Sequence, residues 1–350
     1  MIRVLIVEDS PTVKELLVHI LSADPDIRVI GTAANGEEAL EAVERNKPDV
    51  VTMDIHMPKM DGLEATRRIM ETHPVPIVIV SGSRNAREVT TSFRAMEAGA
   101  LAVLPRPTGI GHPDHEAMTT ELVRTVKLMS EVRVVRRWAR SPLGTAVARA
   151  VREPSLPKQP LTQIDLIAIG ASTGGPIVLQ TILSKLPKDF SIPILIVQHM
   201  VADFIPGFVE WLDQTGSIPI HVAAHGESLL PGHTYIAPGG YQMKVETGRK
   251  ISLTRGEPEN GHRPSVSHLF RSVAEAFGGR AVGVLLTGMG KDGSEELKLM
   301  KDRGAVTIAQ DEESSVVHGM PGEAIKIDGA DYVLPPDKIA AALAGLVNRK

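Results

Sequence analysis

The chain has 350 residues, 43% of them hydrophobic, and the usual domain size of about 100–200 residues predicts two domains. The formal net charge of −4 gives no reason to expect nucleic acid or an anionic membrane as a partner. The absence of cysteine excludes disulfides, thiolate metal sites and a cysteine nucleophile. No signal-peptide pattern and no apolar run of about 18 residues is present, so we expect a cytoplasmic protein that does not insert into a membrane.

The first 107 residues alternate short runs rich in Val and Ile with stretches of helical periodicity. This alternation is typical of a doubly wound parallel sheet, because each crossover helix packs on a face of the sheet. We therefore expect an α/β domain over residues 1–107 with a five-stranded parallel sheet. Its predicted strands are Val4–Val7, Ile27–Ala33, Val50–Met53, Ile77–Val80 and Ala100–Leu104.

The remaining chain divides into a linker and a second domain. Residues 108–160 begin with a helical stretch and end in a Pro-rich segment, which predicts a linker with a helical start. The alternation resumes in residues 161–350, which predicts a doubly wound, mostly parallel α/β domain. Its predicted strands are residues 164–169, 192–197, 218–222, 233–237, 281–286, 305–308 and 331–334.

Three acidic residues follow predicted strands of the first domain. Glu8 and Asp9 follow the first strand, and Asp54 follows the third. These strands should be neighbours in the sheet, so the carboxylates should meet at one end of it. Like charges at that distance need a cation, and oxygen ligands suit Mg²⁺, with the backbone carbonyl of His56 as a further predicted ligand.

A hydroxyl and a cation are predicted to join this acidic pocket. Ser81 ends the fourth strand and Arg106 follows the fifth. A carboxylate beside Mg²⁺ and flanked by these two groups can accept a phosphoryl group. A single acid at a strand end is usually a helix cap, but the whole set at matching strand ends favours a functional site.

Three residues of catalytic type lie at or just beyond strand ends of the second domain. They are Ser172, His199 and Asp292, and the shared edge of a parallel sheet predicts that they converge on one cleft. A serine needs a base to become a nucleophile, and neutral imidazole can remove its proton. A carboxylate on the far ring nitrogen holds the required tautomer. The pattern therefore predicts a nucleophile, a base and an orienting acid.

Taken alone, each of these residues has a plainer explanation. A lone histidine is more often structural, and Asp292 could cap a helix. The Gly-rich turn at residues 170–175 could bind the phosphate of a dinucleotide, but that motif expects an acid at the end of the next strand, where Gln198 and His199 stand. Nucleophilic chemistry is therefore favoured. Glycines that would leave backbone N–H groups uncovered for an oxyanion are Gly170, Gly174, Gly175, Gly288 and Gly290.

Residues 1–107 resemble a flavodoxin-like response-regulator receiver domain. The resemblance implies that Asp54 accepts a phosphoryl group from a CheA-type histidine kinase, with Mg²⁺, and that Ser81 and Arg106 form the phospho-switch. Receivers of this type carry Lys where Arg106 stands and often an aromatic residue where Val103 stands, so the switch geometry should differ here. The matching segments are Val-Glu-Asp-Ser (7–10), Met-Asp-Ile-His-Met-Pro-Lys-Met-Asp-Gly (53–62), Ile-Val-Ser (79–81) and Pro-Arg-Pro (105–107).

Residues 164–325 resemble the catalytic domain of the chemotaxis protein-glutamate methylesterases, the CheB family. The resemblance implies that Ser172 is the nucleophile, His199 the base and Asp292 the orienting acid, with Thr173 and the backbone of Met289 at the oxyanion. It implies no cofactor for the esterase reaction. The matching segments are Gly-Ala-Ser-Thr-Gly-Gly (170–175), Gln-His-Met (198–200), Leu-Pro-Gly-His-Thr-Tyr-Ile-Ala-Pro-Gly (230–239), His-Arg-Pro-Ser-Val (262–266), Leu-Thr-Gly-Met-Gly-Lys-Asp-Gly (286–293) and Gly-Met-Pro-Gly-Glu-Ala-Ile (319–325).

The implied activity is hydrolysis of γ-glutamyl methyl esters on the cytoplasmic domain of a methylated chemoreceptor, giving glutamate and methanol. Glutaminyl deamidation is the implied second activity. Two positions depart from the family pattern, because Ser267 replaces an Asp and His318 replaces an aromatic residue. We expect both at the rim of the site, where they would affect substrate preference. A catalytically inactive binding module and a dinucleotide-binding protein are the alternative interpretations.

Overall fold

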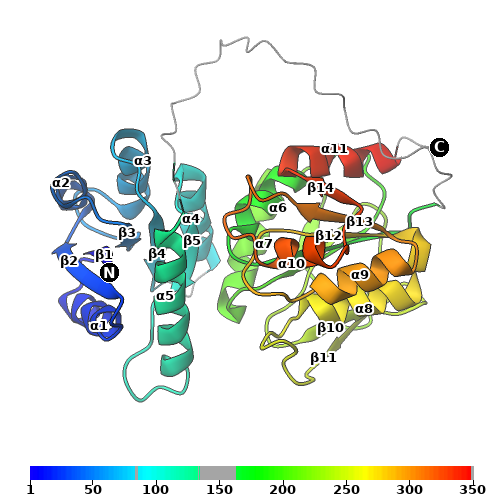
Figure 1. The fold of residues 1–350 in the computed structure, drawn as a ribbon, viewed down its shortest axis with the longest axis horizontal. Helices are drawn as coiled ribbons and strands as arrows, with labels where there is room; N and C mark the ends of the chain where they lie inside the picture. The colour runs from blue at the N-terminus through cyan, green and yellow to red at the C-terminus, as the bar shows by residue number, and fades with distance from the viewer. Residues whose placement is uncertain (83–85, 133, 135–162, 348–350) are drawn as a thin grey trace, which may run out of the picture. The chain divides into compact units, whose positions relative to one another are not determined.

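The computed structural model describes residues 1–82, 86–132, 134 and 163–347. The chain forms two compact units, Met1–Glu153 and Pro154–Lys350, and each is described by itself (Figure 1). Residues 135–160, the second half of the predicted linker, lie outside the described residues. Within the described ranges, no helix is long and apolar enough to cross a membrane.

The first unit contains the predicted five-stranded sheet, and all its strand pairs are parallel. The strand order is β2-β1-β3-β4-β5, so β1 and β3 are neighbours, as the acidic pocket requires. Almost every strand residue in the middle of the sheet is buried, which is why these strands are continuous apolar runs. The strands are β1 (Ile2–Val7), β2 (Ile27–Ala33), β3 (Val50–Met53), β4 (Ile77–Ser81) and β5 (Ala102–Pro105).

Helices cover both faces of this sheet (Figure 1). Helices α1 (Pro11–Ser22) and α5 (His115–Ser130) contact each other on one face. Helices α2 (Gly36–Asn46), α3 (Gly62–Thr72) and α4 (Ala86–Ala98) form the layer on the other face, with α3 between its two neighbours. The domain is therefore doubly wound, as the sequence predicts.

Helix α5 lies in the segment that the sequence analysis assigned to the linker. It packs against β3, β4 and β5 through a buried stripe that includes Leu122, Val126 and Met129. The spacing of these residues places them on one face of a helix. The Lys127 ammonium also contacts the carboxylates of Asp24 and Asp26 after α1. The helix thus completes one layer of the first unit, which extends beyond residue 107.

The second unit contains a sheet of seven parallel strands in the order β14-β13-β12-β6-β7-β9-β8. Strand β6 lies between β12 and β7, so the chain leaves β6 toward one side and later returns on the other. Ligands bind at such switch points, beyond the carboxyl ends of the strands. The strands are β6 (Leu166–Ala171), β7 (Ile194–Gln198), β8 (Ile220–Val222), β9 (Thr234–Ile236), β12 (Ala281–Leu285), β13 (Val306–Gln310) and β14 (Tyr332–Leu334).

An antiparallel hairpin, β10 (Gln242–Val245) and β11 (Ile251–Thr254), lies outside this sheet. These two strands were not predicted from the sequence, because no helix separates them along the chain. Helix α8 (Val266–Ala276) packs against β10 and against three strands of the main sheet. The hairpin therefore extends the layer that covers the carboxyl end of β6.

The remaining helices form two layers. Helix α9 (Ser294–Asp302) lies beside α8, and α10 (Met320–Lys326) lies beside α9. Helices α6 (Gly175–Leu183), α7 (Ile205–Thr215) and α11 (Pro336–Val347) form the other layer. Two single 3₁₀ turns, Ala202–Phe204 and Gly278–Arg280, complete the unit. The large core between the sheet and α8 includes the fully buried Phe270 and Leu285.

Gly62 lies against the backbone of the loop after β3, and the shape of that loop depends on this close approach. A Cβ atom on Gly62 would lie 1.9 Å from the backbone oxygen of Asp54 and 2.9 Å from Cα of Ile55. Backbone atoms cannot yield as a flexible side chain can, so the loop would have to move. Gly109 in the same unit has open space around its Cβ position.

We therefore expect Gly62→Ala to lower the free energy of unfolding of the first unit by about 1–3 kcal/mol, the usual cost of overpacking. Gly109→Ala is the matched control and should have little effect. Urea unfolding followed by hydrogen exchange of residues 50–62 measures the difference. Equal stability of the two variants would contradict the close approach.

Candidate active site and acidic pocket

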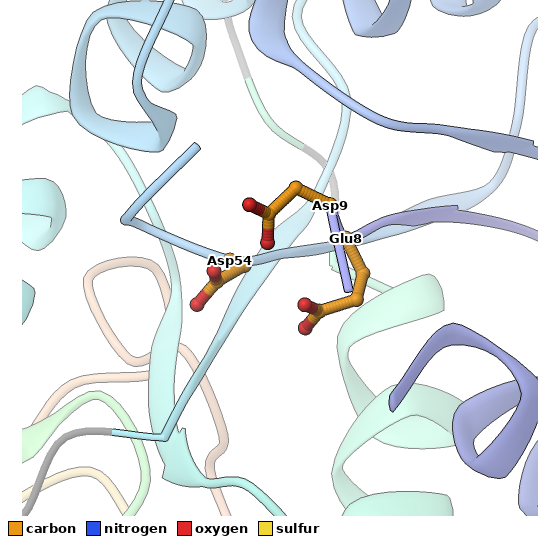
Figure 2. Close-up of side chains that lie close together, drawn as sticks. All are labelled: Glu8, Asp9 and Asp54. Atoms are coloured by element: carbon orange, nitrogen blue, oxygen red, sulfur yellow. The ribbon is translucent and has the colours of Figure 1, made fainter. Parts of the chain in front are cut away.

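The acidic pocket forms where two neighbouring strands end. Strand β1 leads into Glu8 and Asp9 and strand β3 into Asp54, and the last residues of the two strands, Val7 and Met53, are paired in the sheet. Figure 2 shows the three side chains gathered at this end of the strands. One carboxylate oxygen from each lies within 4.8 Å of the others. Glu8 and Asp54 are buried and Asp9 is exposed, so the pocket has a closed floor and an open side.

Arg106 contacts two of these carboxylates. Its Nη2 lies 3.0 Å from Oε2 of Glu8 and 3.3 Å from Oδ1 of Asp54. Its backbone N–H donates to the carbonyl of Ser81, 2.8 Å away, which places both predicted switch residues beside the pocket. A single nitrogen of the guanidinium thus bridges Glu8 and Asp54.

The pocket holds more negative charge than Arg106 neutralises. Burial, and then the charge of Asp54, raises the pKa of Glu8 to about 7. Burial also raises the pKa of Asp54, although Arg106 opposes that shift. Carboxyl groups with raised pKa values and oxygen atoms within one coordination sphere fit a divalent cation such as Mg²⁺.

The other predicted residues of this pocket differ in exposure. Ser81 is buried at the end of β4, while His56 is exposed on the loop after β3. Val103 lies half-buried in β5. The backbone carbonyl of His56 stays a predicted ligand.

In the second unit, Ser172 directly follows β6 on a turn that two other strand ends hold. Its N–H donates to the carbonyl of Thr287, 3.0 Å away, after β12. Its carbonyl accepts from Nε2 of Gln198 at the end of β7, 2.9 Å away, and from the N–H of Gly175. These bonds leave the hydroxyl half-exposed at the switch point of the sheet.

His199 and Asp292 form a buried pair beside this turn. Nε2 of His199 lies 2.9 Å from Oδ2 of Asp292, and both side chains are less than a tenth exposed. The N–H of His199 donates to the carbonyl of Ala171, the residue before Ser172. The Nδ1 atom of His199 is buried and has no hydrogen-bond partner among the described residues. Nδ1 is therefore the ring nitrogen left for the serine hydroxyl.

Asp292 accepts hydrogen bonds from five donors. Besides His199, they are the side chains of Asn260 and Ser265 and the backbone N–H groups of Val266 and Ser267, at 2.6 to 3.2 Å. Burial alone would raise the pKa of Asp292, but the hydrogen bonds outweigh it and hold the pKa well below its usual range. Asp292 therefore stays ionised and orients His199.

Ser267 does not lie at the rim, where the sequence analysis placed it. It is buried, and its Oγ accepts from the N–H of Gly293 and from Nδ2 of Asn260. The second position of α8 brings it directly under Asp292. Asn260 is a supporting residue that sequence reasoning missed, and Ser265 lies within the matching segment 262–266 but had no predicted role. The other departure, His318, is half-buried and pairs through its backbone with Gly288.

The two residues predicted to assist an oxyanion lie on turns next to Ser172. The carbonyl of Thr173 accepts from Oγ1 of Thr287, which joins the turn after β6 to the turn after β12. Met289 follows Gly288, where a Cβ would lie 2.7 Å from Cβ of Ser172. The two turns therefore approach closely, and their roles at an oxyanion stay predictions.

Comparisons with known proteins show what each unit is similar to. Residues 167–343 match the model of the CheB methylesterase family, and residues 4–112 match the model of the response regulator receiver domain. The second unit is similar to the crystal structure of the Thermotoga maritima CheB methylesterase catalytic domain. That likeness has a TM-score of 0.51 and 39% identity, and it covers 53% of this chain and 100% of the other.

Two curated relatives match along nearly their whole length. A protein of Nitrosospira multiformis is 59% identical over 347 residues, covering 99% of this chain and 97% of its own. A protein of Geobacter metallireducens is 58% identical over 353 residues, covering all of both chains. Both are named protein-glutamate methylesterase/protein-glutamine glutaminase. The chain therefore belongs to the CheB methylesterase family, with a response-regulator receiver domain before its catalytic domain.

Proposed function

We propose that Ser172, His199 and Asp292 perform the chemistry of this receiver-regulated protein-glutamate methylesterase and protein-glutamine glutaminase of chemotaxis. The observation that carries the proposal is the buried pair of His199 and Asp292, which leaves Nδ1 of His199 buried and without a partner in the part of the chain that the structure describes. Without that pair, Ser172 would be a serine on a Gly-rich turn. With it, a base of defined tautomer lies on the neighbouring strand end.

The reaction begins when a γ-glutamyl methyl ester binds at the switch point of the sheet. Nδ1 of His199 removes the proton from the Ser172 hydroxyl as Oγ forms a bond to the ester carbonyl carbon. The imidazolium is stabilised by the ionised Asp292 at Nε2. His199 then gives the proton to the departing methoxy oxygen, and methanol leaves an acyl-serine.

Water then hydrolyses the acyl-serine, and His199 and Ser172 act in the reverse order. His199 takes a proton from water, the hydroxyl oxygen attacks the acyl carbon, and Ser172 recovers its proton as glutamate leaves. With a glutaminyl side chain the departing group is ammonia, and the products are again glutamate and the free serine. Thr173 and the backbone of Met289 would stabilise the negative oxygen in both tetrahedral steps.

For the first unit we propose that Asp54 is the phosphoacceptor, with Mg²⁺ held by Glu8, Asp9, Asp54 and the carbonyl of His56. Bound Mg²⁺ would neutralise these carboxylates and the charge of the transferred phosphoryl group. The burial and raised pKa values of Glu8 and Asp54 support this assignment. Arg106 and Ser81 would then bind the phosphoryl oxygens on the aspartate.

The proposed partners follow from this chemistry. A CheA-type histidine kinase supplies the phosphoryl group, and the methylated cytoplasmic domain of a chemoreceptor is the substrate, so the protein works in the cytoplasm. The unphosphorylated receiver would hinder access of a bulky receptor helix to Ser172. Phosphorylation of Asp54 would shift the population toward an accessible state.

Replacing Ser172 or His199 with Ala should lower kcat by a factor on the order of 10⁴–10⁶, because the residues act as one unit. Asp292→Asn should cost about 10⁴, because the wrong imidazole tautomer would be favoured. Methanol release from methylated receptor measures the loss, with Ser184→Ala, an exposed serine after α6, as the control. Near wild-type turnover by Ser172→Ala would exclude an acyl-serine.

The raised pKa of Glu8 predicts how pH affects the receiver. The pKa rises from 4.5 to about 7 in the folded state, so the folded receiver favours the protonated group. Without divalent cations, the stability that Glu8 contributes should be fully present below pH 4.5 and should be lost as pH rises through about 7. Mg²⁺ must displace that proton, so its affinity should rise about tenfold per pH unit below about 7 and then level off.

Calorimetric Mg²⁺ titrations and chelator-treated unfolding curves measure both effects. Glu8→Gln should remove the part of the pH dependence that Glu8 causes, between pH 4.5 and about 7, whereas Glu15→Gln, an exposed acid on α1, should keep it. A Mg²⁺ affinity that does not change with pH in the wild-type protein would show that Glu8 is not a ligand.

Deleting residues 1–134 tests the regulation. The truncated protein should hydrolyse methylated receptor faster than the unphosphorylated full chain, and a small soluble ester at about the same rate. Steady-state rates on both substrates make the comparison. Slower hydrolysis of the receptor by the truncated form would mean that the receiver recruits the substrate instead of hindering it.

A further inference from the structure

A second imidazole lies flat against the proposed base. The ring centroids of His199 and His262 are 3.8 Å apart, and the two ring planes differ by 9°. This is close contact over the whole face of the ring. His262 is half-buried, so it forms one wall of the site.

The hydrogen bond to Asp292 by itself does not define the orientation of His199. It restrains the position of one atom, Nε2, while small rotations about the two side-chain bonds can still tilt the ring. Tilting moves Nδ1, the atom that must face Ser172, and a displacement of about 1 Å at a reacting group can cost about 10²-fold in rate. A flat neighbour against the ring face restricts that tilt.

The segment that carries His262 is itself firmly held. The backbone of His262 exchanges two hydrogen bonds with Glu259, of 2.9 and 3.0 Å. The carbonyl of His262 also accepts from Nε2 of the buried Gln242, whose Oε1 accepts from the N–H of Ser265. Gln242 begins β10, so the hairpin outside the main sheet supports this wall.

The same segment contacts the acid of the pair. Asn260 donates to Oδ1 of Asp292 from a backbone with a φ of 53°, a left-handed conformation that few residues other than glycine adopt. Residues 259–262 therefore contact His199 through the ring of His262 and Asp292 through Asn260. The two contacts restrain both members of the pair from one side.

We propose that His262 is a positioning residue for the esterase and glutaminase reactions, whose flat ring holds the plane of His199 so that Nδ1 faces Ser172. The proposal rests on the assignment of His199 as the base. His262 acts through His199 and takes no proton in the reaction. What it supplies is a flat face, which a phenyl ring also offers and an aliphatic side chain does not.

The test compares His262→Phe with His262→Leu in the full-length protein. Both side chains fill the space and neither carries a ring nitrogen, so they differ in flatness. We expect His262→Phe to keep kcat on methylated receptor within about threefold, and His262→Leu to lower it about 10–100-fold with KM changed less than about twofold. His225→Ala, an exposed histidine of the same unit, is the control and should resemble the wild type.

Double variants show whether His262 acts through the base. In a His199→Ala background, His262→Leu should cause no further loss, because there is no ring left to position. A further loss of 10–100-fold there would overturn the proposal. Equal loss of kcat in His262→Phe and His262→Leu would overturn the role of the flat face and assign the effect to a ring nitrogen of His262. Wild-type kcat in both variants would show that His262 has no role in the reaction. Full activity of His199→Ala itself would reject the proposed base, a result distinct from all of these.

Discussion

The proposed catalytic unit depends on one buried carboxylate. Asp292 lies after β12, yet its five donors come from the residue after β7, from the segment before α8 and from the first turn of α8. Two of the donors are backbone N–H groups at the amino end of a helix, where negative charge is favoured. A buried carboxylate without such donors would be very costly. By accepting them all, Asp292 joins the carboxyl end of the sheet to the layer that covers it, and fixes the tautomer of His199.

The two domains share a doubly wound architecture and use buried acids in opposite ways. Asp292 has enough donors to hold its pKa low, so its charge is permanent and serves orientation. Glu8 and Asp54 are buried beside each other with one guanidinium, and their pKa values are raised. That imbalance suits the proposed binding of a cation and a phosphoryl group in this pocket. The number of donors around each acid, more than its position at a strand end, decides which role it can take.

The turns around Ser172 are packed so closely that some positions have no room for a side chain. Gly288 leaves room for Ser172, and Gly175 leaves room for Oε1 of Gln198, where a Cβ would lie only 2.3 Å away. These approaches let three strand ends exchange backbone hydrogen bonds around Ser172. Gln242 and the segment of His262 then close the site from the hairpin side. The serine turn is thus held by parts of the chain more than a hundred residues apart.

The sequence by itself determined the fold class, the order of the strands along the chain and the placement of Ser172, His199, Asp292 and the acidic pocket at strand ends. Apolar periodicity and motif spacing are local properties, so they can be read without coordinates. Tertiary structure alone decided that Asp292 contacts Nε2, that Ser267 is buried beneath it, that Arg106 bridges Glu8 and Asp54, and that α5 belongs to the first domain. Each of these depends on which distant segments meet and how their side chains are turned, and no periodicity along the chain records that.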